Sequence, residues 1–308
     1  MAHNLKKFAN QAEYEAATLN YPAVSWIVSG DTVAFDKEAP APPTPTFSGF
    51  TVCYYIADPS VEVNLFNGGG SSSSSSSESG SESGGGGAMP TSMIVDGVDE
   101  TPIATWRFNT AGEHVVQYSF EDNGIIDNFV QSITYITKVE IGNGITSIGN
   151  NALEGCSGLT SCTFAQDSQL TSIGNGAFTE CNSLTSVAIP SSVTSIGGGA
   201  FYGCSSLTSV TIPSSVTSIN FEVFYGCSGI TSVTIPSSVT SIDGGAFRYC
   251  LALTSITINA ADPPTLGSRA FDDTSNAPIY VLASSVEMYK TSTSTGWSVY
   301  ASRIQAIP

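Results

Sequence analysis

The sequence predicts a mainly β protein with short helices, in which a solenoid of about six 23-residue coils follows a small β-domain and an N-terminal helix-hairpin unit. Two observations support this prediction. Apolar residues and cysteines recur at a constant period in the C-terminal half, and short alternating apolar segments separated by Gly, Pro and Asp precede them. With 41% apolar residues among 308, the chain can bury a core.

The solenoid is predicted from three nearly identical copies of one unit, which run over 184–204, 207–227 and 230–250. In the second copy, Leu207, Val210 and Ile212 have the L-x-x-L-x-L spacing of a leucine-rich repeat, whose short strand turns these side chains inward. Degenerate copies extend the array over 136–156, 159–181 and 253–271. One coil cannot bury its own apolar face, so the coils must stack.

Five of the seven cysteines occupy one position in successive coils: Cys156, Cys181, Cys204, Cys227 and Cys250. A buried free thiol behaves as a small hydrophobic group. A zinc site would need paired short spacings such as C-x-x-C, and the sequence has none. We therefore expect a column of packed thiols in place of a metal site or a disulfide framework, and we expect no cofactor.

Both ends of the solenoid need caps, because the end coils expose apolar edges. Residues 121–308 are predicted as the solenoid with its C-terminal cap. At the start, 112–120 alternates as a strand containing a half-exposed His114, and 125–130 is interpreted as an imperfect helical turn. At the end, 279–282 is predicted as a strand and 286–289 as a helix. Trp297, Tyr300 and Ile304 belong to a closing helical segment.

The N-terminal part is predicted as two smaller units. Residues 1–46 form an anchoring unit with a helix over 11–19, a hairpin of 24–28 with 32–35, and a Pro-rich spacer. Residues 47–120 form a small β-domain that contains the Ser/Gly-rich segment 67–90, which is expected to be a disordered loop. The alternative for 67–90 is a linker between two domains.

Charge and composition exclude several classes of function. Nine Lys and Arg against 26 Asp and Glu give a net charge of −17, which repels nucleic acid and anionic membranes. No apolar run is long enough to insert into a membrane, and no signal peptide is recognisable at the N-terminus. The two histidines, His3 and His114, cannot supply a Ser-His-Asp relay or a histidine metal cluster. We therefore expect no enzyme.

Two resemblances extend this prediction. The repeat Leu207-Thr-Ser-Val-Thr-Ile-Pro-Ser-Ser-Val-Thr-Ser-Ile-Asn-Phe-Glu-Val-Phe-Tyr-Gly-Cys227 resembles the BspA-like leucine-rich repeats of surface proteins from gut and oral bacteria, over about Gly112 to the C-terminus. This likeness implies adhesion or protein recognition. Phe8-Ala-Asn-Gln-Ala-Glu-Tyr-Glu-Ala-Ala17, with Tyr21-Pro-Ala-Val-Ser-Trp26, resembles N-terminal modules of structural proteins of phages that infect Bacteroides-type hosts.

Together the resemblances imply a non-enzymatic phage structural appendage, a fibre or decoration protein made in the host cytoplasm and carried on the virion surface. Its N-terminal unit would bind virion proteins, and its solenoid would bind a host cell-surface protein or glycan. A homo-oligomer is left open. The alternative is a BspA-like adhesin, secreted or held on a bacterial cell surface, that binds host or matrix proteins.

Two outward-facing surfaces are candidate binding sites. One is a hydroxyl rank on the predicted strands, Thr211, Thr234 and Thr257. Its alternative is a solvated sheet face of good β-propensity. The other is a column directly after the core Phe of each coil, made of Tyr202, Tyr225 and Arg248, with Tyr249 adjacent. Tyr and Arg are enriched at binding hot spots. Its alternative is exposed decoration of the repeat.

Overall fold

The computed structural model describes residues 25–29, 32–36, 49–57, 59, 62–65, 90–102, 105–119, 124–126, 129–293 and 295–308. The chain forms two compact units, Met1–Phe47 and Ser48–Pro308. In the first, β1 (Ser25–Ser29) and β2 (Thr32–Asp36) pair antiparallel, which confirms the predicted hairpin. The predicted helix over 11–19 and the Pro-rich spacer lie outside the described residues.

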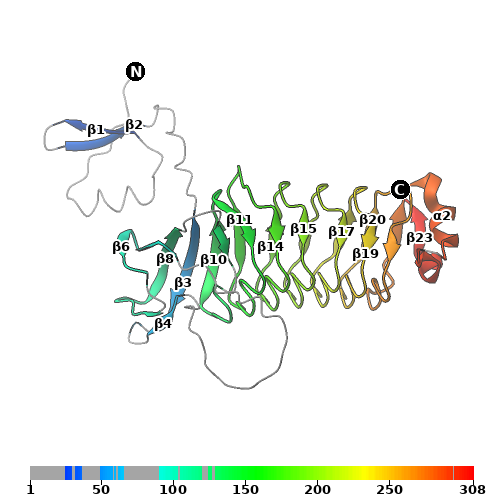
Figure 1. Cartoon of the computed structure of the whole chain (residues 1–308), viewed down its shortest axis with the longest axis horizontal. Helices are drawn as coiled ribbons and strands as arrows, with labels where there is room; N and C mark the ends of the chain where they lie inside the picture. The colour runs from blue at the N-terminus through cyan, green and yellow to red at the C-terminus, as the bar shows by residue number, and fades with distance from the viewer. Residues whose placement is uncertain are drawn as a thin grey trace, which may run out of the picture. The chain divides into compact units, whose positions relative to one another are not determined.

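The second unit contains two ranks of parallel strands stacked coil upon coil (Figure 1). The first rank is β10 (Ile136–Ile141), β12 (Ser161–Phe164), β14 (Ser186–Ala188), β16 (Ser209–Thr211), β18 (Ser232–Ile235), β20 (Ser255–Ile258), β22 (Ile279–Val281) and β23 (Ile304–Ala306). The second is β9 (Gly124–Ile126), β11 (Ile145–Ile148), β13 (Ser172–Ile173), β15 (Ser195–Ile196), β17 (Ser218–Ile219), β19 (Ser241–Ile242) and β21 (Thr265–Leu266). The predicted solenoid is confirmed, with about 7 turns.

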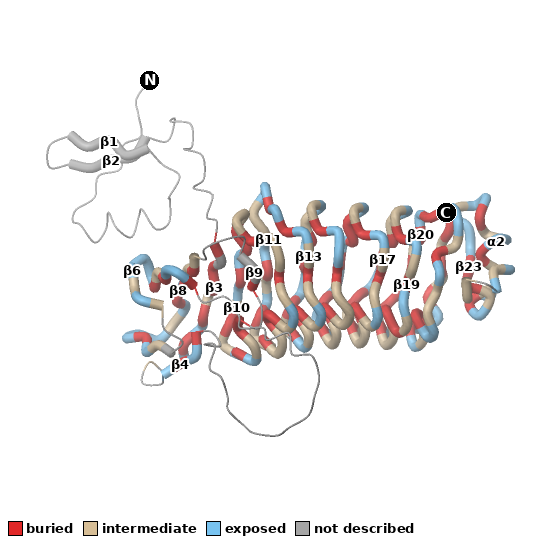
Figure 2. The backbone as a smooth tube through the Cα atoms, in the orientation of Figure 1, coloured by how far each residue is buried: buried red, intermediate tan, exposed pale blue. Residues whose placement is uncertain are grey.

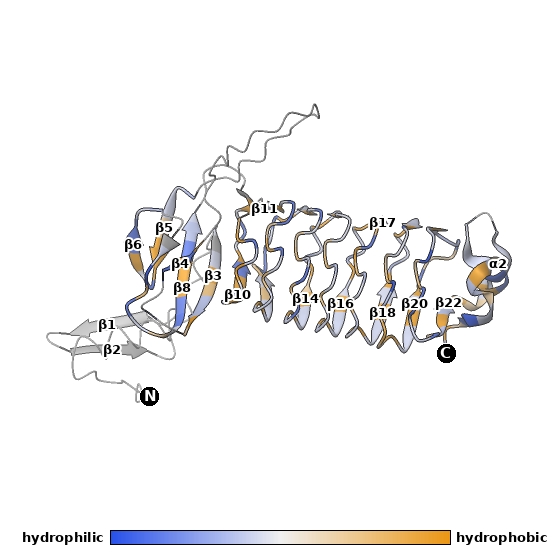
Figure 3. Ribbon diagram, turned by 90° about the horizontal axis from the view of Figure 1, so that it is seen from below, coloured by the Kyte–Doolittle hydropathy of each residue, from blue (hydrophilic) through white to orange (hydrophobic). Residues whose placement is uncertain are grey.

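The apolar positions of the repeat line the inside of the coils, as the recurring buried segments in Figure 2 and apolar segments in Figure 3 show. Leu207, Val210 and Ile212 are buried, as their spacing predicts. The central column is a stack of phenylalanine rings whose neighbouring centroids lie between 5.1 and 5.5 Å apart. Its members are Phe178, Phe201, Phe224, Phe247 and Phe271. Each coil therefore covers the apolar face of the one before it.

The cysteine column is buried beside these rings, as predicted. Each thiol donates a hydrogen bond to a backbone carbonyl of the preceding coil. Cys204 Sγ lies 3.1 Å from the oxygen of Phe178, and Cys227 Sγ lies 3.0 Å from the oxygen of Phe201. Burial raises the pKa of Cys204 to about 12, so this thiol stays protonated and unreactive at neutral pH.

An antiparallel cap continues the first rank at its N-terminal end. β3 (Phe50–Ile56) pairs with β10 and with β8 (Gly112–Ser119), and β8 pairs with β5 (Ser92–Val95), which pairs with β6 (Val98–Glu100). β4 (Val63–Asn64) and β7 (Thr105–Trp106) form a separate pair. The predicted boundary between 47–120 and 121–308 thus falls inside one compact unit with one hydrophobic core.

The two ends of the solenoid differ from the prediction in detail. The helical turn predicted over 125–130 is wrong, because Ile126 lies in β9 and pairs with Ile148 of β11. At the C-terminal end, η1 (Ala283–Ser285), α2 (Val286–Thr291) and η2 (Trp297–Arg303) confirm the helical segments. Ile304, predicted in the closing helix, instead starts β23 beside Ile279. In both places pairing with a neighbouring coil overrides the local apolar period.

The segment 67–90, predicted as a loop, lies outside the described residues except for Pro90. Its flanking strands β4 and β5 are described and belong to the same compact unit.

Candidate functional site

The threonine rank, made of Thr211, Thr234 and Thr257, lies on the outer face of the sheet formed by the first rank of strands. Thr211 and Thr234 are exposed, and Thr257 is half-buried. Thr234 pairs in register with Thr257, which pairs with Tyr280 of β22. The structure therefore gives a line of side chains across the strands that runs through Tyr280 to Gln305 of β23.

Other threonines in the repeat serve the backbone. The hydroxyl of Thr208 donates to the carbonyl of Thr185 at 3.1 Å, and that of Thr254 donates to the carbonyl of Thr231 at 2.9 Å. Thr240 Oγ1 bonds the carbonyl of Thr217 at 3.2 Å in the same way. These hydroxyls form hydrogen bonds between neighbouring coils. This structural role explains why Thr is abundant in the repeat, and no ligand is needed to explain it.

Tyr202, Tyr225, Arg248 and Tyr249 form one continuous surface, which we call the tyrosine-arginine column. The rings of Tyr202 and Tyr225 stack with centroids 4.8 Å apart, and Tyr225 meets Tyr249 edge-on at 5.2 Å. All four side chains are half-buried. Desolvation, with the neighbouring Tyr225 phenol and the Glu222 and Glu180 carboxylates, raises the pKa of Tyr202. The column thus presents phenol edges and hydroxyls, because the stacked ring faces cover each other.

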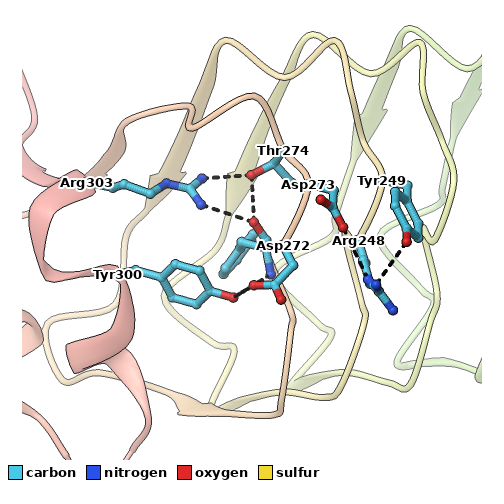
Figure 4. A network of polar contacts seen from close by, with 8 residues as sticks. Arg248, Tyr249, Asp272, Asp273, Thr274, Tyr300 and Arg303 are labelled. Carbon is cyan, nitrogen blue, oxygen red and sulfur yellow. Dashed lines mark hydrogen bonds and ion pairs between the residues drawn. The ribbon is translucent and has the colours of Figure 1, made fainter.

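Arg248 is held against Tyr249 at the C-terminal end of this column (Figure 4). Its Nη2 donates to the hydroxyl of Tyr249 at 2.9 Å, and its Cζ lies 4.5 Å from the centre of that ring. Its Nε lies 3.5 Å from a carboxylate oxygen of Asp273, an ion pair without a hydrogen bond. The guanidinium is therefore oriented before any ligand arrives.

Tyr249 has a left-handed backbone conformation at a position where the two preceding coils have glycine. Tyr249 has φ of 60°, and the equivalent residues Gly203 and Gly226 both have φ of 71°. A bulky side chain in this region costs about 1–2 kcal/mol. Glu180 and Asp273 occupy the same repeat position with φ of 58° and 56°, so left-handed non-glycine residues recur there and Tyr249 is set apart by its side chain alone.

Three further residues beside the column were not singled out from the sequence: Phe221, Glu222 and Arg269. Phe221 is 58% exposed, and Glu222 and Arg269 are left-handed with φ of 54° and 59°. The signal that could have found them is their departure from the repeat. Asn220-Phe221-Glu222 stands where the preceding coil has Gly197-Gly-Gly199.

A depression of about 730 Å³ lies at the C-terminal cap. Its Tyr300, Asp272 and Arg303 side chains are already bonded within the chain (Figure 4). Tyr300 donates to Asp272 at 2.8 Å, and Arg303 donates to Thr274 at 2.8 Å and to the carbonyl of Phe271 at 3.1 Å. Burial lowers the pKa of Arg303. We assign this network to holding the cap on the last coil.

His114 is buried in the N-terminal cap, not half-exposed as expected. Its Nδ1 lies 2.6 Å from the Asp96 carboxylate, and its Nε2 lies 2.9 Å from the carbonyl oxygen of Thr110. Its ring stacks on Phe108 at 4.1 Å. Both ring nitrogens are engaged, so the histidine holds the cap together.

Within the described ranges, no group of three or more His, Cys, Asp or Glu side chains is placed to hold a metal ion. Among the same residues, no helix combines the length and apolar character needed to cross a membrane.

The family model of the BspA type leucine rich repeat region matches residues 123–254 and 194–295, in six copies. None of the curated proteins compared with the chain matches it.

Several solved bacterial structures are similar to the chain. The T. pallidum leucine-rich repeat protein is 23% identical, with 56% of this chain and 91% of that one covered and a TM-score of 0.43. A leucine-rich repeat protein from Eubacterium ventriosum is 21% identical, with 51% and 47% covered and a TM-score of 0.43. One from Bacteroides ovatus is 19% identical, with 57% and 61% covered and a TM-score of 0.37. The chain spans less than two thirds of the last two.

Proposed function

The chain belongs to the BspA type leucine-rich repeat family, and on this basis we propose that its solenoid is a binding scaffold that attaches to a cell surface through the tyrosine-arginine column. No reaction is part of the proposal. Leucine-rich-repeat solenoids offer extended surfaces for recognition, and each coil places a side chain at a fixed spacing.

One observation carries the proposal: Tyr202, Tyr225, Tyr249 and Arg248 form a continuous line of side-chain contacts across three successive coils. Tyr and Arg contribute most to binding hot spots. Stacking already restricts their rotamers, so little side-chain entropy is lost when a partner docks. The threonine rank supports a second, weaker candidate surface, because Thr234 and Thr257 lie in register but offer only single hydroxyls.

The solenoid is proposed to be attached either to a phage virion or to a bacterial cell, and each alternative has its own support. The first is a phage virion, in which residues 1–46 bind virion proteins and the solenoid binds the host cell. The likeness of residues 8–26 to phage structural modules supports it. The second is a bacterial adhesin at the cell surface, or secreted, which membership of the BspA type family supports.

Co-sedimentation of the full chain and of residues 48–308, which form a compact unit, tests both parts. Each is mixed with purified virions of a candidate phage and with host cells. A virion appendage requires that only the full chain sediment with virions and that both chains sediment with cells. Cell binding without virion binding by the full chain selects the adhesin. Failure of both chains to bind cells would reject the recognition function.

A further inference from the structure

We propose that a depression beside the tyrosine-arginine column binds one carboxylate-bearing sugar residue of a surface glycan. The depression has a volume of about 380 Å³ and is lined by Phe221, Glu222, Gly244, Gly245, Arg248, Ser268 and Arg269. This inference rests on the proposed function, and it names the ligand class for the same face of the solenoid.

Two glycines form the floor of this depression. A Cβ on Gly245 would lie 3.1 Å from Cγ of Glu222 and 3.7 Å from Cδ2 of Tyr225. A Cβ on Gly244 would lie 3.3 Å from the carbonyl oxygen of Ser268. Any side chain there would therefore fill the space between the neighbouring coils, and the floor borders the tyrosine-arginine column directly.

The walls come from the coils on either side, at a repeat position that is glycine in three coils, at Gly176, Gly199 and Gly245. Glu222 and Arg269 occupy the same repeat position as Gly245, one coil before it and one coil after it. All three are left-handed, at φ of 54°, 59° and 66°. Two charged side chains are thus held in a conformation that favours glycine, on opposite sides of a glycine floor.

Phe221 supplies an aromatic wall of a different kind from the column. Its ring is 58% exposed and lies over Gly244, with Cδ2 3.6 Å from the position a Cβ would take there. The rings of Tyr202 and Tyr225 stack on each other, whereas the ring of Phe221 stacks on no other ring within the described ranges. The electron-rich face of an aromatic ring attracts the slightly positive C–H face of a sugar.

The charges of the depression select an anionic sugar. Arg269 is exposed and makes no ion pair in the described part of the chain, and Arg248 stands beside it. A guanidinium recognises a carboxylate through two parallel hydrogen bonds. Glu222 on the other wall can accept hydrogen bonds from sugar hydroxyls. The net charge of −17 repels a ligand that carries many negative charges. A ligand with one carboxylate, bound by the two arginines of the depression, avoids most of this repulsion.

The backbone around the depression favours a sugar over a peptide. The amide of Glu222 donates to the carbonyl of Gly244 at 3.1 Å, and the amide of Gly245 donates to that of Ser268 at 3.0 Å. A peptide main chain binds best where strand edges offer free amides and carbonyls. Here those groups bond between coils, and the groups left to a ligand are side-chain guanidinium, carboxylate and hydroxyl.

Calorimetric titration of the full chain with uronic- and sialic-acid oligosaccharides tests the proposal, with the methyl ester of each acid as its uncharged partner. We expect the acids to bind and their esters to bind at least about tenfold more weakly, because a charge-assisted hydrogen bond is lost. In Arg269→Asn the new residue, asparagine, tolerates the left-handed backbone. In Phe221→Ser the new residue is the one that Ser268 supplies at the same repeat position two coils later. Each should weaken acid binding at least about tenfold. Lys290→Gln, which also removes one positive charge, should leave it unchanged.

The outcomes separate this inference from the proposed function. Equal affinity for acids and esters, or no binding of any acid by a folded chain, overturns the acidic-sugar site. If cell attachment is lost in Tyr225→Thr but unchanged in Arg269→Asn, the recognition function stands and the sugar site is rejected. If both variants attach to cells like the parent chain, both proposals fail. Binding of an acidic peptide without any acidic sugar also overturns the inference. Melting curves of every variant confirm that the chain is folded.

Discussion

The phenol rings of Tyr202 and Tyr225 lie nearly parallel, with an angle of 3° between their planes and 4.8 Å between their centroids. Each follows a core phenylalanine, and Phe201 and Phe224 stack in the same way at 5.5 Å. The buried stack therefore fixes the spacing of the half-buried one, and the tyrosine rings inherit the register of the core.

Replacing Tyr225 by Thr should weaken cell attachment at least about tenfold, because hot-spot tyrosines commonly contribute more than 1 kcal/mol. Thr is the residue that the repeat carries at Thr179, so the coil accepts it. Flow cytometry with labelled full chain measures the effect. Thr234→Ser on the other face is the matched control. Loss of attachment in the control alone would move the binding surface to the threonine rank.

Tyr249→Gly should leave thermal stability nearly unchanged. The glycine relieves about 1–2 kcal/mol of left-handed strain. This gain offsets two costs: the loss of the ring contacts with Tyr225 and Arg248, and the greater conformational entropy of an unfolded chain with one more glycine. The reverse change, Gly226→Ala at the equivalent position, should destabilise the chain by about 1 kcal/mol. Denaturant unfolding of both variants gives the comparison. A large loss of stability in Tyr249→Gly would mean that the tyrosine holds the coil together.

Gly197→Ala should destabilise the solenoid by about 3 kcal/mol, because the new methyl would lie 2.4 Å from the backbone nitrogen of Asn175. The coils would have to separate to admit it. Its neighbour offers a matched control. In Gly198→Ala the nearest atom, the carbonyl oxygen of Phe221, is 3.2 Å away, and a change within about 1 kcal/mol is expected. Equal stabilities of the two variants would contradict the close approach between coils.

Alkaline pH should destabilise the solenoid through its thiols. Burial raises the pKa of Cys156, Cys162, Cys204 and Cys250 from 9.0 to about 12. In the unfolded chain these thiols ionise near pH 9, whereas in the native chain they stay neutral. The stability that depends on them is therefore complete below pH 9 and is lost as the pH rises towards 12.

Melting temperatures measured over this pH range, in the presence of a reductant, test the thiol effect. Cys204→Ala should lower the melting temperature at neutral pH, because a packed side chain and its bond to Phe178 are lost. It should also make the decline with pH shallower, because one ionisable group is removed. An unchanged slope would show that other groups govern alkaline unfolding.

The repeat made most of the fold predictable. A 23-residue period defines which side chains face inward, and Val210, Phe224 and Cys227 are buried as that period requires. The cap was harder, because pairing of β3 with β10 joins residues far apart in sequence. Register pairs such as Val52 with Val139 leave no local signal.

The candidate site was predictable only in part. Tyr202, Tyr225 and Arg248 share one repeat position, so the sequence alone placed them in a column. The depression beside them depends on backbone conformation. The left-handed φ of Glu222 and Arg269 appears only in three dimensions, although both residues replace a glycine of the repeat.

The hydrogen bonds between equivalent residues of successive coils make the solenoid a molecular ruler. Inserting one further 23-residue unit would move everything behind it by one strand spacing, about 4.8 Å, and would leave the packing of each coil as it was. A unit added between 204 and 207 would lengthen the core stack and carry the depression away from Tyr202 as a rigid block. Distances between sites on this surface are therefore multiples of the coil spacing. Duplication of the coding sequence for one coil would lengthen the solenoid by one such step.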